Sequence, residues 1–180
     1  MNELKTQAKA LRAQIETAFA NVPYPGDDNI APRTQMDDDY DDVIVHLTGK
    51  HWRDLIPKRK PPKGRSNPIS HSLCFATSEA WLFFLPAYMI ADIMMGRTDF
   101  REFDPGRSEQ LNDHIESRFR LLNAEQCTVI ASFLSYAVMR LNENQIKYPN
   151  HYKFFERERQ HLVVLIDYWS ARARIVAKSV

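Results

Sequence analysis

Apolar residues recur every three or four positions over most of this 180-residue chain, a spacing that favours α-helices. The first such stripe stops before Pro23 and consists of Leu4, Ala8, Leu11, Ile15 and Phe19. The chain holds only five glycines, whereas sheet-rich folds use glycine in their many turns. We therefore expect an all-α fold, a single-domain helical bundle over residues 1–180. It should contain about five to six helices and end in a long C-terminal helix that starts near His151.

Cap residues mark several of the expected helix starts. Thr77 precedes the apolar run at 81–95, and Asn123 followed three residues later by Gln126 has the spacing of a capping box. Pro86 falls inside the 81–95 run, where we expect it to kink or divide the helix because proline lacks a backbone N–H.

Residues 38–48 fit either a helix or a short strand. Val43, Ile44 and Val45 favour a strand, whereas Tyr40, Val43, Ile44 and Leu47 would share one helical face. The acidic start of the segment suits a helix N-terminus, and Gly49 suits the C-terminal end. We therefore predict a helix, with the strand as the alternative.

The run Ala80–Met95 is the one candidate for a membrane span. It is shorter than the roughly 20 residues that a span needs, and it contains Pro86 and Asp92. We expect a buried central helix and no membrane partner. The charged N-terminus lacks the apolar segment of a secretion signal, and the two cysteines suggest no disulfide framework. The sequence thus favours a cytoplasmic protein.

Charges of opposite sign occupy neighbouring segments, which the formal net charge of +1 conceals. Residues 27–42 carry seven aspartates against one cation, Arg33, and residues 50–65 carry seven cations against one acid, Asp54. Residues 56–68 include four prolines and one glycine, so we expect an exposed basic loop there. Segregated charge of this kind acts on partners and on association rates rather than on the fold.

We interpret the acidic segment as a surface that binds a partner protein, most simply a basic one. The concrete version is an immunity-type protein that binds and neutralises a toxin. The residues predicted to contact the partner are Asp27, Asp28, Asp37, Asp38, Asp39, Asp41, Asp42 and Trp52. No catalytic or cofactor motif occurs in the sequence, so we expect a binding protein without a cofactor rather than an enzyme.

Two alternatives remain open. A metal-assisted enzyme would use Asp27, Asp28 and His51 with carboxylates from residues 37–42, provided that the loop and the second helix converge. The calcium-loop pattern itself fails, because Asp42 stands where glycine is needed. The basic loop from Lys58 to Arg65 could instead contact nucleic acid, although the acidic segment would repel the same phosphates.

Three motifs suggest a family. They are Pro23-Tyr24-Pro25-Gly26-Asp27-Asp28-Asn29-Ile30, Gly49-Lys50-His51-Trp52 and Leu85-Pro86-Ala87-Tyr88. Together with the Leu122–Gln126 turn, they resemble an uncharacterised bacterial domain family of unknown function over roughly residues 10–140. The resemblance implies a bacterial cytoplasmic protein and directs attention to residues 24–30 and 49–52. The chain departs from the family pattern in the KRKPPKGR stretch and in the C-terminal helix, and no catalytic residue carries over.

Overall fold

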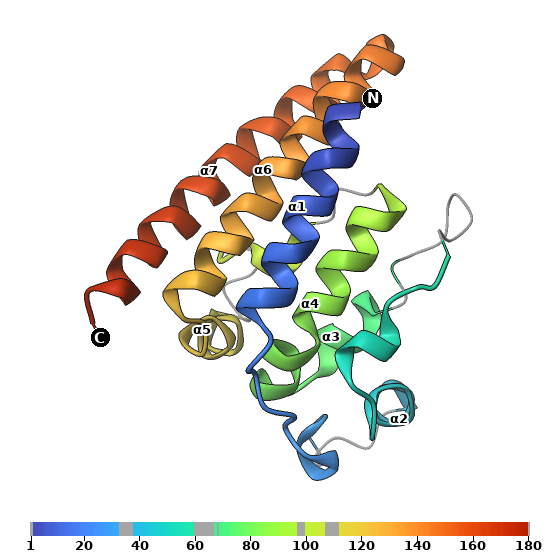
Figure 1. Cartoon of the computed structure of the whole chain (residues 1–180), viewed down its shortest axis with the longest axis vertical. Coiled ribbons are helices and arrows are strands. Elements are labelled where there is room, and N and C mark those ends of the chain that lie inside the picture. The colour runs from blue at the N-terminus through green and yellow to red at the C-terminus, as the bar shows by residue number, and fades with distance from the viewer. Residues whose placement is uncertain are drawn as a thin grey trace. The chain divides into compact units, whose positions relative to one another are not determined.

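The computed structural model describes residues 2–32, 38–59, 67, 69–96, 100–106 and 112–179. Every regular element in these ranges is a helix, so the all-α fold class is confirmed (Figure 1). The α-helices are α1 (Asn2–Ala18), α2 (Asp38–Leu47), α3 (Ser70–Phe75), α4 (Ser78–Met95), α5 (Asn112–Arg120), α6 (Ala124–Lys147) and α7 (Tyr152–Ala177). Short 3-10 helices are η1 (Asp27–Asn29), η2 (Trp52–Leu55), η3 (Arg101–Phe103) and η5 (Pro149–His151).

Within this fold the chain forms two compact units, each described by itself. The hairpin unit comprises Met1–Ala18, Gly96–Asp104 and Asn123–Val180, and the α4 unit comprises Phe19–Met95 and Pro105–Leu122. The chain therefore crosses from one unit to the other more than once, and neither unit is a continuous stretch of sequence.

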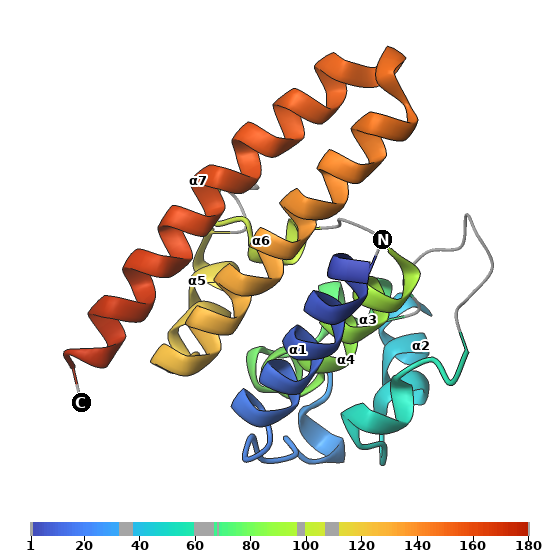
Figure 2. The ribbon, with the colours of Figure 1, turned by 45° about the horizontal axis from the view of Figure 1, so that its top comes forward.

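The hairpin unit is built on the two longest helices, α6 and α7, which run antiparallel and are joined by η5 (Figure 2). Helix α1 packs on α6, and the Gln126 side chain donates a hydrogen bond from Nε2 to the carbonyl oxygen of Ala18 (3.2 Å). The buried Trp169 donates from Nε1 to the carbonyl oxygen of Phe103 (2.9 Å), which ties η3 to α7. The long C-terminal helix predicted from the sequence is therefore confirmed.

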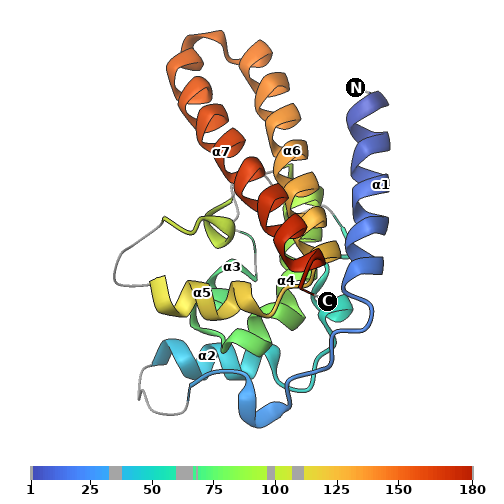
Figure 3. The same ribbon diagram turned by 90° about the vertical axis from the view of Figure 1, so that its left-hand side faces the viewer.

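The α4 unit surrounds its apolar helix with short elements. Helix α4 packs with η2, α3 and α5 (Figure 3). The buried Arg118 donates from NH2 to the carbonyl oxygens of Leu73 (2.8 Å) and Ala76 (2.9 Å), so a cation of α5 satisfies the C-terminal end of α3. This long-range contact has no local sequence signal.

Helix α4 passes the length and hydropathy test for a membrane span, but 67% of that window is buried inside the protein. A core helix of a folded domain passes the same test, so the finding agrees with the expected buried helix. Pro86 lies in its interior, yet the helix continues without a break from Ser78 to Met95. Of the two expected outcomes, a kink or a division of the helix at Pro86, the division does not occur, and residues on both sides of the proline are buried.

The predicted helix ends agree with the structure. Thr77 Oγ1 accepts a hydrogen bond from the Ala80 backbone N–H (3.1 Å), and Asn123 and Gln126 form both bonds of the capping box. Residues 38–47 are helical, and Gly49 has a positive φ of 69° just after that helix. The six-residue helix α3 was not predicted, because it is too short to show a periodic pattern.

The predicted exposed loop at residues 56–68 lies partly outside the described residues, which omit 60–66 and 68. Lys58 and Arg59 are exposed, as expected. Asn67 is buried instead, with only 3% of its surface exposed. Its Nδ2 donates to the carbonyl oxygen of Tyr88 (3.0 Å) and to Oδ1 of Asp92 (2.9 Å). The expectation of exposure therefore fails at Asn67, since this side chain ties the end of the segment to α4.

Candidate functional site

The acidic residues of the described part lie on η1 and α2 in the α4 unit. Asp27 and Asp28 are exposed in η1, and Asp41 and Asp42 are exposed in the N-terminal half of α2. Asp37 and the side chains of Asp38 and Asp39 lie outside the described residues. We call the four described aspartates the acidic surface.

A hydrogen-bonded clamp joins η1 to the end of α2. Tyr24 donates from its hydroxyl to Oδ1 of Asp27 (2.5 Å), and the Gly49 backbone N–H donates to the Tyr24 hydroxyl oxygen (2.8 Å) and to Asp27 Oδ1 (3.1 Å). Burial and the hydrogen bond to Asp27 raise the pKa of Tyr24, so its hydroxyl keeps the proton that it donates. The clamp brings together the two motifs that the family resemblance singled out.

The Phe83 ring of α4 packs against residues of both motif segments. It makes edge-on contacts with Tyr24 (centroids 5.3 Å apart) and with His51 (5.4 Å). The buried Phe83 therefore holds both motif segments against the helix that forms the core of the α4 unit.

The clamp also fixes where Asp27 lies relative to α2. Asp27 is held beside Gly49, whereas Asp41 lies six residues before the last residue of α2, about 9 Å from that end of the helix at 1.5 Å per residue. The carboxylates are thus divided between η1, beside the end of α2, and the first half of α2. Ligands of a single hard cation lie within about 2.6 Å of it, so a shared site would need Asp27 and Asp41 to approach each other across the length of α2 between them.

His51 is also committed to a local role. Its Nδ1 accepts a hydrogen bond from the Arg53 backbone N–H (3.1 Å), while Asp54 Oδ2 accepts one from the His51 backbone N–H (3.1 Å). These bonds form the capping box of η2. In the described part of the chain, no three His, Cys, Asp or Glu side chains gather as metal ligands. The metal-assisted alternative requires such a group of ligands, and the described residues do not form one.

Trp52 does not belong to the surface on which the sequence placed it. Its side chain is fully buried, and the Arg53 guanidinium lies 4.2 Å from the ring centroid. A partner that binds this conformation cannot contact the Trp52 ring. Trp52 instead contributes to the packing of η2 against α4.

Val45 is a surface residue that the sequence reasoning missed. Its side chain is 79% exposed, and it lies three and four residues after the exposed Asp42 and Asp41 on the same side of α2. The sequence contained a signal for this exposure. The apolar helical face predicted for residues 38–48 includes Val43, Ile44 and Leu47 but not Val45. Tyr24, at 37% exposure, adds a second apolar group beside Asp27.

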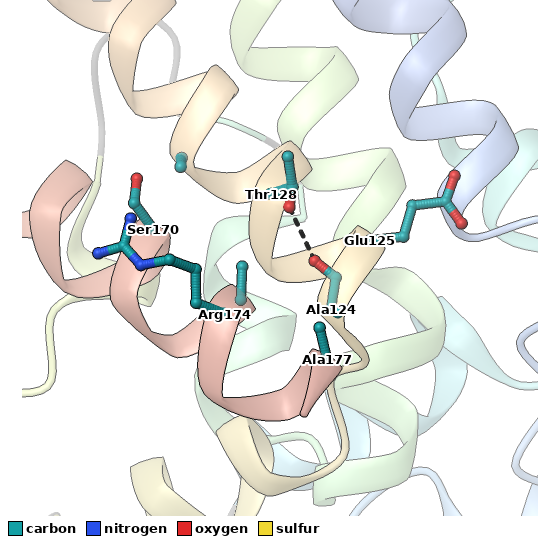
Figure 4. Close-up of a pocket in the computed structure, with 8 residues that line it drawn as sticks. Ala124, Glu125, Thr128, Ser170, Arg174 and Ala177 are labelled. Carbon is teal, nitrogen blue, oxygen red and sulfur yellow. Dashed lines mark hydrogen bonds between the residues drawn. The ribbon is translucent and has the colours of Figure 1, made fainter. Parts of the chain in front are cut away.

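A groove in the hairpin unit is lined by few ionisable side chains. It has a volume of about 440 Å³ and is lined by small side chains of α6 and α7, with Glu125 and Arg174 beside them (Figure 4). The Thr128 hydroxyl in it donates to the carbonyl oxygen of Ala124 (2.9 Å) within its own helix. Glu125 and Arg174 are the ionisable groups among its lining residues, and the lining includes no cysteine or histidine. The groove therefore supplies no arrangement for nucleophilic catalysis.

These features define a small all-α protein whose described, exposed aspartates lie on η1 and α2. The chain belongs to a family of unknown function (DUF6714), whose profile matches residues 7–173. The match includes most of α7, so the family extends further than the resemblance over residues 10–140 indicated. No curated protein and no solved structure matches the chain.

Proposed function

We propose that this protein is an interaction protein that binds a basic partner protein through the acidic surface. The observation that supports this function is the position of Val45 beside Asp41 and Asp42. Protein interfaces combine a desolvated apolar centre with a polar rim, and Val45 with its flanking carboxylates offers both on one helix.

The charges of this helix are available to a partner. Within the described residues, no ion pair neutralises Asp41 or Asp42. Carboxylates in this state attract cations over a Debye length of about 10 Å at 0.1 M salt, so they raise the association rate with a basic surface. The concrete form of the proposal is an immunity-type protein of the bacterial cytoplasm that neutralises a basic toxin.

The Tyr24 clamp contributes rigidity to this surface. It fixes η1 against the end of α2, so Asp27 is held in place before a partner binds. A preorganised surface loses less conformational entropy when the partner binds.

The test is capture of a partner from native lysate with the tagged protein at low and at high salt. We expect one stoichiometric basic protein that is retained at low salt and released at high salt. Its association rate should fall by about tenfold when Asp41 and Asp42 are both replaced by asparagine. The control carries Asp113→Asn and Asp167→Asn, two exposed aspartates on α5 and α7 that change the net charge equally.

Val45→Ser separates the apolar contribution from the charge. This change should raise the dissociation rate and leave the salt dependence unaltered, because it removes no charge. Capture of no stoichiometric partner would contradict the proposal. A partner that binds the Asp41/Asp42 variant and the control variant equally well would contradict it too.

A further inference from the structure

The far end of the α6–α7 hairpin exposes a dense group of apolar side chains. Residues Asn144 to Phe155 form the last turn of α6, the η5 connection and the first turn of α7, and we call them the hairpin end. Their four large exposed side chains are Ile146 (82%), Tyr148 (55%), Tyr152 (53%) and Phe154 (51%). A cluster of this kind marks a binding surface, whereas single exposed apolar residues are ordinary.

The hairpin end also has a charge of one sign. It contains Lys147 and Lys153, the exposed His151, and no aspartate or glutamate. Lys147 reaches one acid, Glu143, in the preceding turn at 3.5 Å. The surface therefore combines aromatic rings with cations and suits an anionic partner.

The shape of the hairpin unit leaves this surface accessible. A groove between α1 and α6 is lined by residues from Gln7 to Gln14 and from Ser132 to Met139, so it ends before the last turn of α6. The 24 residues of α6 exceed the 17 residues of α1, and Figures 1 and 3 show the hairpin end extending past the N-terminal end of α1. Helix α1 therefore does not cover the hairpin end.

We propose that the hairpin end binds the surface of an anionic lipid bilayer. Tyrosine and phenylalanine rings partition into the interface between headgroups and acyl chains, and Lys147 and Lys153 would meet the lipid phosphates. Ile146, the most exposed of the four side chains, would enter furthest. Only the hairpin end would enter the interface, since α6 and α7 are too polar along their lengths to span a membrane.

The charge pattern argues against the other occupants. Two hairpin ends packed against each other would place Lys147 and Lys153 next to the same cations of a second copy, and residues 144–155 themselves include no acid to pair with them. A folded protein partner would need a concave acidic pocket to enclose a convex helical end, whereas a bilayer deforms around it. This inference is independent of the proposed function, because the acidic surface lies in the other unit.

Vesicle flotation of the full chain tests the proposal. We expect binding to vesicles of phosphatidylcholine mixed with phosphatidylglycerol, and weak binding to pure phosphatidylcholine. Replacing Lys147 and Lys153 by glutamine should weaken binding to the anionic vesicles roughly fivefold for each lysine. Ile146→Ser with Tyr152→Ser should weaken it on both kinds of vesicle, and all four replaced side chains are exposed enough for the fold to persist.

The matched controls are Val45→Ser and Val164→Ser, which remove exposed apolar side chains elsewhere in the chain. They should bind vesicles as the wild type does. A second measurement reports insertion directly, through an environment-sensitive fluorophore on Ile146→Cys in a Cys74→Ser background. Burial raises the pKa of the remaining thiol, Cys127, to about 11, so that residue stays unlabelled in the folded protein.

A blue shift of the fluorophore on anionic vesicles would support the proposal. Absence of vesicle binding would overturn it, as would binding that the hairpin-end variants retain in full. Capture of an acidic protein or of nucleic acid by the hairpin end, without vesicle binding, would assign the surface to another class of partner and would overturn it as well.

Discussion

His46 makes one of the side-chain contacts between α2 and α3. Its Nδ1 lies 2.8 Å from Oγ of the buried Ser72, and Lys50 donates to the carbonyl oxygen of His46 (2.5 Å). Burial lowers the pKa of His46, and the nearby Lys50 charge lowers it further. The imidazole is therefore held in its neutral form by the packing of two helices.

This histidine predicts how stability depends on pH. The unfolded chain takes up a proton near the ordinary pKa of 6.5, whereas folded His46 takes it up only at a lower pH. The free energy of unfolding should therefore fall as the pH drops from 6.5 through the lowered pKa, and change little above that range. Urea unfolding across this range should show a smaller decline for His46→Gln than for the wild type.

His114 strengthens the same trend, because burial and Arg118 lower its pKa as well. The His46→Gln chain should accordingly keep part of the acid sensitivity. Replacement of the exposed His151 by glutamine serves as the control. An unchanged pH profile in the His46→Gln protein would show that burial of His46 does not lower its pKa in the folded chain.

At the scale of elements, Asn67 determines how the connection between η2 and α3 is anchored. It bonds to two groups of α4, and its own Oδ1 accepts a hydrogen bond from the Ile69 backbone N–H (3.1 Å). Asp92, which receives one of these bonds, is fully buried. Deleting a segment that includes Asn67 would therefore disturb the α4 core rather than remove an idle loop.

Replacing Asn67 by alanine should lower the free energy of unfolding by about 2–3 kcal/mol, because buried polar groups lose their hydrogen-bond partner. Arg59→Ala, an exposed change in the same connection, should stay within about 0.5 kcal/mol. Chemical denaturation of the two variants measures the difference. Equal stabilities would mean that water or a rearranged side chain satisfies Asp92 and the Tyr88 carbonyl.

At the scale of the whole molecule, the separation of Asp27 from Asp41 has a consequence for metal binding. A protein that binds a metal only when folded gains stability with the logarithm of the metal concentration. We expect no such gain, because Asp27 lies beside the end of α2 and Asp41 in its first half, and no three metal-ligand side chains gather among the described residues. The melting temperature should be the same with EDTA and with magnesium, calcium, manganese or zinc. An increase that disappears in Asp27→Asn would restore the metal-assisted alternative.

Local patterns were sufficient to predict most helices of this chain. The spacing of apolar residues located α1, α4, α6 and α7, and the cap residues Thr77 and Asn123 marked helix starts, because periodicity and capping operate within a few residues. Gly49 decided in favour of a helix over a strand at residues 38–47 for the same reason. The sequence also showed that charge is segregated along the chain.

Only the tertiary structure decided which of these residues reach the surface and which converge. Trp52 is buried and Val45 is exposed, although both are apolar residues beside charged ones, because burial depends on the elements packed against them. The Tyr24–Asp27–Gly49 clamp, the Asn67 anchor on α4 and the Arg118 bonds to α3 join residues 22 to 45 positions apart. Such contacts depend on the path of the chain in space, and a single sequence carries no local signal for them.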